Sequence, residues 1–145
     1  MAKEISTSII INATPEKVWS ILTDFENYHT WNPFITSISG TPEVGGKITA
    51  HLQPPGAKSM TFKPKVLVFE PEKEFRWLGH LGIPGLFDGA HRFQLIDNGN
   101  GTTTFIQSER FRGMLIPLFR KMLDTNTKNG FIAMNEQLKI RAELQ

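Results

Sequence analysis

Residues 117–145 read PLFRKMLDTNTKNGFIAMNEQLKIRAELQ, and their apolar positions repeat with helical spacing. Pro117 is tolerated only in the first turn of a helix, so the helix is predicted to begin at about residue 116. At 1.5 Å per residue it is ~40 Å long. A helix of this length must pack its apolar stripe against another element. The stripe consists of residues 118, 119, 122, 123, 133, 134, 138 and 142.

The other end of the chain predicts a strand followed by two short helices. Residues 4–12 are rich in isoleucine and alternate loosely, which is typical of a strand. Thr14 can cap a helix whose first position is Pro15, where a missing N–H costs nothing. Asp24 is expected to cap a second short helix that ends at about Tyr28.

The middle of the chain predicts a meander of strands. Residues 97–101 read DNGNG, a hairpin signal, because Asn and Gly accept the positive φ angles of tight turns. The expected fold is α+β: a curved, seven-stranded antiparallel sheet around the C-terminal helix, in a single domain spanning 1–145. The six strands after the short helices are 34–40, 47–52, 60–70, 73–80, 86–96 and 102–111.

Five motifs follow one another along nearly the whole chain. They are Ile11-x-Ala13-x-Pro15-Glu16-x-Val18-Trp19, Tyr28-x-x-Trp31-Asn32-Pro33-Phe34, Trp77-x-Gly79, His91-x-Phe93-x-Leu95 and Phe105-x-Gln107-x-Glu109-x-Phe111. In content and order they resemble the SRPBCC superfamily, which includes START domains and pollen allergens, and in particular its bacterial polyketide cyclase/dehydrase-like branch. The resemblance implies a helix-grip fold with a cavity between sheet and helix. Because the superfamily shares a cavity rather than a catalytic motif, the fold does not select one activity.

Composition excludes several classes of function. The chain has no cysteine, so disulfides and thiolate chemistry are ruled out. A formal net charge of +2, with acidic residues interleaved among the basic ones, argues against a nucleic-acid interface. No run approaches the ~20 apolar residues of a membrane span, and the N-terminal residues lack a signal-peptide pattern, so no integral membrane association and a cytoplasmic location are expected.

No metal site and no permanent cofactor are expected either. The four histidines show no ligand spacing such as His-x-x-x-His. Gly45-Gly46-Lys47 superficially resembles a phosphate-binding loop, but Thr41 and Ile48 stand where that motif needs glycine and a hydroxyl residue.

A small polar cluster is predicted on the inner face of the sheet. A register that pairs Leu95 with Thr103 also pairs Phe93 with Phe105 and His91 with Gln107. Glu109 and Trp77 then lie beside His91 on the same face. The His91–Glu109 pair could act as a general acid and base, and the cluster could equally orient a ligand or merely satisfy its own hydrogen bonds.

Two further segments are candidates for the cavity. The loop 81–87 is apolar although rich in turn residues, so it is expected to act as a lid or to cover the end of the core. In the helix, Asn126 and Gly130 interrupt the apolar stripe, which indicates either a void or a close approach to the sheet. The expected ligand-binding residues are Trp77, His91, Phe93, Phe105, Gln107, Glu109, Asn126, Gly130 and Met134, with lid residues Ile83, Leu86 and Phe87.

The leading functional hypothesis is binding or transport of a hydrophobic small molecule of lipid, polyketide or aromatic type. The alternative is an enzyme that cyclises or dehydrates a polyketide-like substrate, with His91 and Glu109 moving protons. A third possibility is a partner protein or membrane surface that docks on the 81–87 loop.

Overall fold

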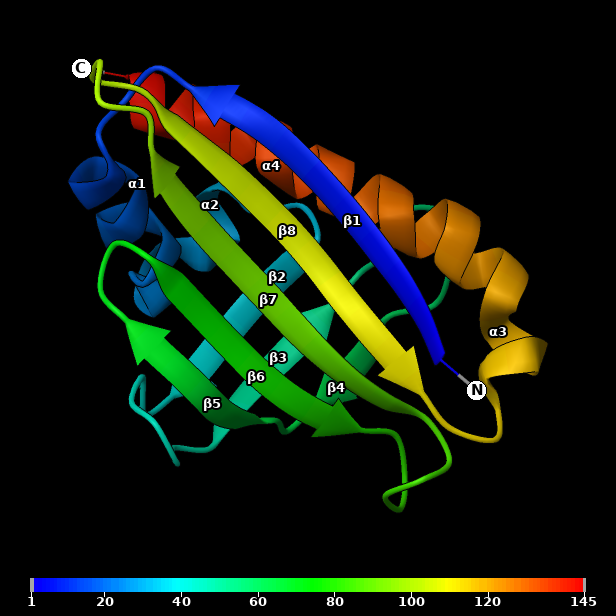
Figure 1. Cartoon of the computed structure of the whole chain (residues 1–145). Helices are drawn as coiled ribbons and strands as arrows, with labels where there is room; N and C mark the ends of the chain where they lie inside the picture. Colours follow the sequence, from blue (N-terminus) through cyan, green and yellow to red (C-terminus); the bar gives the residue numbers. More distant parts are fainter. Residues whose placement is uncertain (1, 145) are drawn as a thin grey trace.

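The computed structural model describes residues 2–144 and shows an α+β fold in which strands dominate (Figure 1). The strands are β1 (Ala2–Ile11), β2 (Ile35–Gly40), β3 (Ile48–Leu52), β4 (Met60–Phe62), β5 (Lys65–Glu70), β6 (Glu74–His80), β7 (Asp88–Asp97) and β8 (Thr103–Arg112). The helices are α1 (Pro15–Leu22), α2 (Tyr28–Trp31), α3 (Ile116–Met122) and α4 (Lys128–Glu143), with a 3₁₀ turn η1 (Phe25–Asn27) and a π-helical segment η2 (Leu123–Thr127).

The strands form two antiparallel sheets, so the prediction of one seven-stranded sheet is wrong. The larger sheet has the order β1-β8-β7-β6-β5 and the smaller one the order β2-β3-β4. Residues 60–70, predicted as one strand, divide at Pro64 into β4 and β5, which belong to different sheets. Proline has no backbone N–H to donate to a neighbouring strand, so strand pairing is interrupted at Pro64. The chain leaves one sheet there and enters the other.

The region between β1 and β2 agrees with the expectation of short helices. The Thr14 side chain accepts a hydrogen bond from the Lys17 N–H at 3.3 Å, and Pro15 occupies the first turn of α1. Asp24 does not cap a backbone N–H, contrary to the expectation. Instead its carboxylate accepts a hydrogen bond from the Asn27 side chain at 2.7 Å, and a 3₁₀ turn leads into α2.

The C-terminal helix begins at Ile116, as predicted, but it is not a uniform α-helix. Residues 123–127 form a π-helical segment between α3 and α4. Their sequence LDTNT has four residues with low helix propensity in a row, which weakens the regular i→i−4 pattern there. Figure 1 shows α4 running alongside β1, and Lys139 donates to the Ile10 carbonyl at 2.9 Å across this contact.

The core lies between the inner face of the larger sheet, the smaller sheet and α4. Alternate residues of β6, β7 and β8 point inward, as the period of two requires. Their aromatic rings pack against one another from strand to strand, for example Phe75 against Phe93 with centroids 5.8 Å apart and Phe93 against Phe105 at 6.1 Å. The inner face of the larger sheet is therefore a continuous aromatic wall.

Tyr28, the only tyrosine of the chain, is fully buried, and its hydroxyl donates to the Leu22 carbonyl at the end of α1. Burial, and secondarily the negative charge of Asp24, raises the pKa of Tyr28 far above its ordinary value. Because the unfolded chain releases this proton at about pH 10 and the folded chain retains it, stability present below pH 10 is lost as the pH rises further, by about 1.4 kcal/mol per pH unit.

Absorbance at 295 nm provides the test, since it reports the phenolate of this single residue. We expect no phenolate in the folded protein until the alkaline unfolding transition, whereas protein in guanidinium chloride should titrate near pH 10. The Tyr28→Phe variant is the control, because its stability should lack this component of the decline above pH 10. A phenolate that forms near pH 10 in the folded protein would contradict the burial of this hydroxyl.

Candidate functional site

The predicted polar cluster exists, but the strand register differs from the prediction by two residues. His91 on β7 pairs with Glu109 on β8, and Phe93 pairs with Gln107. The loop between the strands consists of the five residues 98–102 and is closed by hydrogen bonds such as Asn98 N–H to the Thr102 carbonyl at 3.1 Å, so the strands pair from Asp97 and Thr103 onward. A shift of two residues keeps every side chain on its face, which is why the cluster is still assembled.

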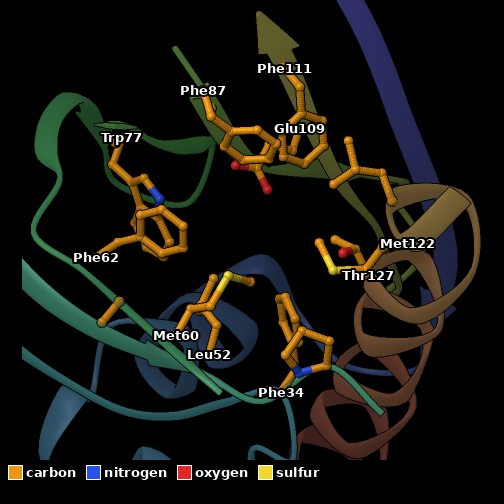
Figure 2. A pocket seen from close by; sticks show the side chains of 15 residues that line it. Phe34, Leu52, Met60, Phe62, Trp77, Phe87, Glu109, Phe111, Met122 and Thr127 are labelled. Atoms are coloured by element: carbon orange, nitrogen blue, oxygen red, sulfur yellow. The ribbon is translucent and has the colours of Figure 1, made fainter. Parts of the chain in front are cut away.

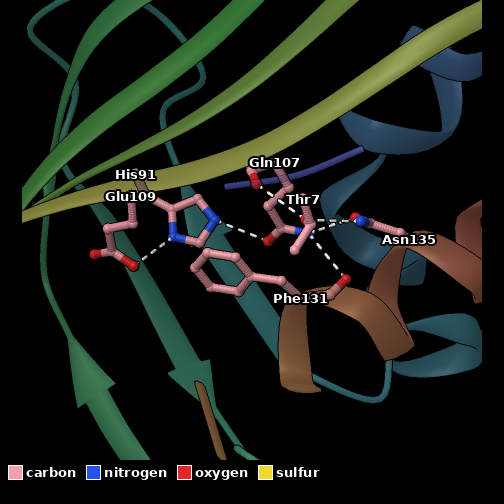
Figure 3. A network of polar contacts seen from close by, with 6 residues as sticks. All are labelled: Thr7, His91, Gln107, Glu109, Phe131 and Asn135. Carbon is pink, nitrogen blue, oxygen red and sulfur yellow. Dashed lines mark hydrogen bonds and ion pairs between the residues drawn. The ribbon is translucent and has the colours of Figure 1, made fainter. Parts of the chain in front are cut away.

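His91 is the centre of this cluster and is completely buried. Its Nδ1 lies 3.0 Å from Glu109 Oε1, and its Nε2 lies 2.9 Å from Gln107 Oε1 (Figure 3). The Trp77 ring on the neighbouring strand lies 5.0 Å from the imidazole, centroid to centroid, as their pairing in the β6–β7 register requires. Aromatic rings thus surround the imidazole, and only its two nitrogens meet polar groups.

The cluster continues through two residues that the sequence did not reveal. Gln107 Nε2 donates to Asn135 Oδ1 at 2.8 Å, and Asn135 Nδ2 donates to Thr7 Oγ1 at 2.8 Å. The Thr7 hydroxyl in turn donates to the backbone carbonyl of Gln107 at 3.0 Å. A detectable signal did exist, because Asn135 is a polar residue in phase with the buried positions Phe131 and Leu138 of the helix.

The most enclosed apolar pocket among the described residues lies beside this cluster, between both sheets and the π-helical segment (Figure 2). Its walls enclose about 550 Å³ when the open mouth is included, but only about 30 Å³ is free for the centre of a water molecule. The aromatic side chains therefore fill most of the space, which holds little more than one or two waters in this state. The lining residues are Phe34, Ala50, Leu52, Pro54, Met60, Phe62, Trp77, Gly79, Phe87, Gly89, Glu109, Phe111, Met122, Leu123 and Thr127.

Glu109 and Thr127 are the two polar residues of this lining. The Glu109 side chain is 12% exposed and uses Oε1 for His91, while Oε2 lies over Gly89, where an added Cβ would come within 2.2 Å of it. Thr127 belongs to the π-helical segment and is 6% exposed. Figure 2 shows Glu109 at the top of the pocket, beside Phe111, and Thr127 on the helical wall at the right.

The predicted ligand-binding residues of the sheet divide into two groups. Trp77 and Glu109 line the pocket. His91 and Gln107 lie behind Glu109 and do not line it, while Phe93 and Phe105 belong to the fully buried aromatic wall. A ligand in the pocket as it stands would contact the first group directly and the second only through it.

The predicted helix residues do not line the pocket. The void expected at Gly130 is filled by Phe34, since a Cβ on Gly130 would come within 2.4 Å of Phe34 Cδ1. Asn126 is turned toward the loop that follows β3, where its Nδ2 donates to the Pro55 carbonyl at 2.7 Å. Met134 is fully buried in the core. Gly130 therefore allows α4 to lie close to the Phe34 ring.

The predicted lid loop is anchored at the end of the pocket. Phe87 lines the pocket and packs on Phe111 and Phe119, with centroids 5.6 and 5.2 Å apart. Leu86 is half-buried, and its carbonyl accepts the Leu115 N–H at 2.9 Å. Ile83 is 66% exposed and faces away from the core. Of the three lid candidates, only Phe87 is part of the pocket wall.

Residues 2–144 contain no candidate metal site and no helix that could span a membrane. No three histidine or acidic side chains are grouped closely enough to hold a metal ion there. No helix in that range combines the length and the hydrophobicity needed to cross a bilayer.

Comparison with solved structures shows the same fold at low sequence identity. The Zhui aromatase/cyclase from Streptomyces sp. R1128 superposes with a TM-score of 0.81 at 14% identity, over 99% of this chain and 94% of that one. Norcoclaurine synthase from Thalictrum flavum, in complex with dopamine and hydroxybenzaldehyde, gives 0.72 at 13% identity over 100% and 90%. A protein from Thermus thermophilus gives 0.75 at 15% identity over 97% of each chain.

Sequence comparison places the chain in a family. No curated protein sequence matches it. The family model described as "Polyketide cyclase / dehydrase and lipid transport" matches residues 2–143. Because this match covers the helices, both sheets and the pocket, the chain belongs to the polyketide cyclase/dehydrase and lipid transport family.

Proposed function

We propose that this protein binds a hydrophobic small molecule in the pocket between its two sheets and the π-helical segment. The observation that carries the proposal is the lining, in which every residue except Glu109 and Thr127 is apolar or glycine. A concave apolar site with a few convergent polar groups is the usual form of a small-molecule site. The family description, which joins polyketide chemistry with lipid transport, supports the same class of ligand.

Binding requires the pocket to widen, because the free space is smaller than an aromatic ring. Met60, Phe62 and Met122 are half-buried side chains of the wall, on β4 and at the end of α3. Methionine side chains change rotamer at low cost and adapt to ligands of irregular shape. We expect these three side chains to move outward when the ligand enters.

Native mass spectrometry of freshly purified protein, followed by solvent extraction, tests the proposal. We expect a discrete apolar passenger, which the Ala50→Leu variant should lose because Ala50 lines the pocket and is 1% exposed. Ala90→Leu is the matched control, since Ala90 lies on the outer face of the larger sheet, away from the pocket. If addition of apolar aromatic compounds also failed to raise the Tm of the wild-type protein, the binding proposal would be wrong.

Enzymatic cyclisation or dehydration of a polyketide-like substrate is the second candidate. Glu109 favours it, because a pocket-facing carboxylate whose other oxygen is hydrogen-bonded to His91 can take a proton from a substrate carbon or hydroxyl. In this role Glu109 is the catalytic residue and His91 positions it. If the wild-type protein turns over a substrate and Glu109→Gln loses this turnover while it retains ligand affinity, the protein is an enzyme. If the wild-type protein binds ligands tightly without turnover, it is a carrier.

A further inference from the structure

The polar groups of the pocket specify the charge of its ligand. We infer that the ligand is uncharged, that it donates a hydrogen bond to Glu109 Oε2, and that it carries a second polar atom facing Thr127. This inference rests on the proposed binding function and adds the chemical class of the ligand. It follows from hydrogen-bond directions that the backbone determines.

The groups around the Gln107 amide determine its orientation. Its Nε2 lies 3.4 Å from the Phe131 carbonyl and 2.8 Å from Asn135 Oδ1. A backbone carbonyl can only accept, so the amide nitrogen must lie on that side and Gln107 Oε1 must face His91. Because Oε1 can only accept, the His91 Nε2 must carry a hydrogen.

The contact between His91 and Glu109 also contains a proton. With Nε2 protonated, the contact between Nδ1 and Glu109 Oε1 needs one further proton, which belongs either to the imidazole or to the carboxyl group. The first arrangement is an imidazolium–carboxylate pair and the second is a neutral imidazole with a carboxylic acid. Both have zero net charge, and in both Glu109 Oε2 is an acceptor.

The second carboxyl oxygen of Glu109 faces the pocket. None of the hydrogen bonds among residues 2–144 ends on Glu109 Oε2, which reaches the pocket over Gly89. No lysine, arginine or second acidic residue lines the pocket. A charged ligand would therefore lose its hydration without meeting an opposite net charge, which is costly in an apolar site. A neutral hydroxyl or N–H supplies the donor that Oε2 lacks.

Thr127 provides an independent observation. Its Oγ1 is buried and has no hydrogen-bond partner among residues 2–144. A helical threonine commonly donates to the carbonyl four residues earlier, as Thr125 does to Lys121 at 2.8 Å. Thr127 does not make this bond, and its side chain lines the pocket instead. A buried hydroxyl without a hydrogen bond lowers stability, so a polar ligand atom beside it would supply the missing hydrogen bond.

Isosteric probes test the inference by calorimetry or thermal shift. We expect 4-ethylphenol to bind at least about tenfold more tightly than 4-ethyltoluene, in which a methyl group replaces the hydroxyl. 4-Methylbenzylammonium and 4-ethylbenzoate should bind more weakly than 4-ethylphenol. Tighter binding of the ammonium would overturn the inference and would show that the pair carries net negative charge, with aromatic faces attracting the cation.

Two variants assign the effect to the named residues. Glu109→Met should abolish the preference for 4-ethylphenol over 4-ethyltoluene, while binding of 4-ethyltoluene remains. If that variant does not fold, Thr127→Val removes a single hydroxyl, and it should abolish any preference for 4-(2-hydroxyethyl)phenol over 4-ethylphenol. Failure of all probes to bind would contradict the binding function itself, whereas equal binding of the phenol and the toluene would contradict only the inferred ligand class.

Discussion

Replacement of His91 by leucine is expected to lower the free energy of unfolding by about 3–5 kcal/mol. Leucine fills a similar volume within the aromatic surroundings of His91, so the packing loss is small. The cost comes from Gln107 Oε1, which is buried and loses its donor, and from Glu109 Oε1, which loses its hydrogen-bond partner on a side chain that is only 12% exposed. Urea unfolding measures the effect, with an unchanged m-value as the sign that the fold is retained.

The double variant His91→Leu/Glu109→Leu separates charge burial from packing. Replacing both members of a buried pair by apolar residues is often nearly neutral, so we expect it to recover more than half of the loss. The remaining deficit then belongs to Gln107, whose Oε1 still lacks a donor. A single His91→Leu variant that costs less than about 1 kcal/mol would show that water replaces the imidazole and that the network does not hold Glu109 in place.

The polar cluster could be predicted from sequence because it depends on parity alone. His91, Gln107 and Glu109 occupy odd positions on adjacent strands, and any even register shift leaves them on one face. The register itself could not be read, because the length of the loop 98–102 is determined by contacts such as Gly99 N–H to the Asp97 carboxylate at 2.9 Å. The neighbour relation between Trp77 and His91, by contrast, is confirmed.

The pocket was less accessible to sequence reasoning, since four of its fifteen lining residues come from the smaller sheet. Ala50, Leu52, Met60 and Phe62 are apolar residues of β3 and β4 that any core could use. Their place opposite Trp77 depends on the break at Pro64, which divides residues 60–70 between two sheets. A proline in an extended run is a signal for such a break, and it predicts that the two halves pair with different neighbours.

The helix shows why a gap in an apolar stripe is ambiguous. At Gly130 the missing side chain admits the Phe34 ring, so the gap marks a close contact rather than a cavity. Three residues earlier, Thr127 is polar and buried, has no hydrogen-bond partner within residues 2–144, and does line the pocket. Sequence spacing identifies where the stripe is interrupted, but only the shape of the opposing side chains determines whether space remains.

Gly113→Ala should be as damaging as the His91 variant, with an expected loss of roughly 3–5 kcal/mol, because it combines two costs. Gly113 has a φ of +137°, which side chains with a Cβ rarely adopt. An added Cβ would also lie 2.2 Å from the Leu86 carbonyl oxygen, a backbone atom that cannot rotate away. The loop 81–87 must then detach, and with it the hydrogen bond from Leu115 N–H to the Leu86 carbonyl.

Gly99→Ala is the matched control, since Gly99 has a φ of +78° with nothing within 4 Å of the added Cβ. It should cost only about 1 kcal/mol, which is the strain of the left-handed conformation alone. The difference between the two variants therefore measures the clash with the 81–87 loop. Hydrogen exchange should accelerate at the Leu81 and Leu115 amides in Gly113→Ala and not in Gly99→Ala. Because Phe87 lines the pocket from this loop, ligand dissociation should accelerate as well in Gly113→Ala. Equal losses of unfolding free energy in the two variants would show that Gly113 does not hold the loop in place.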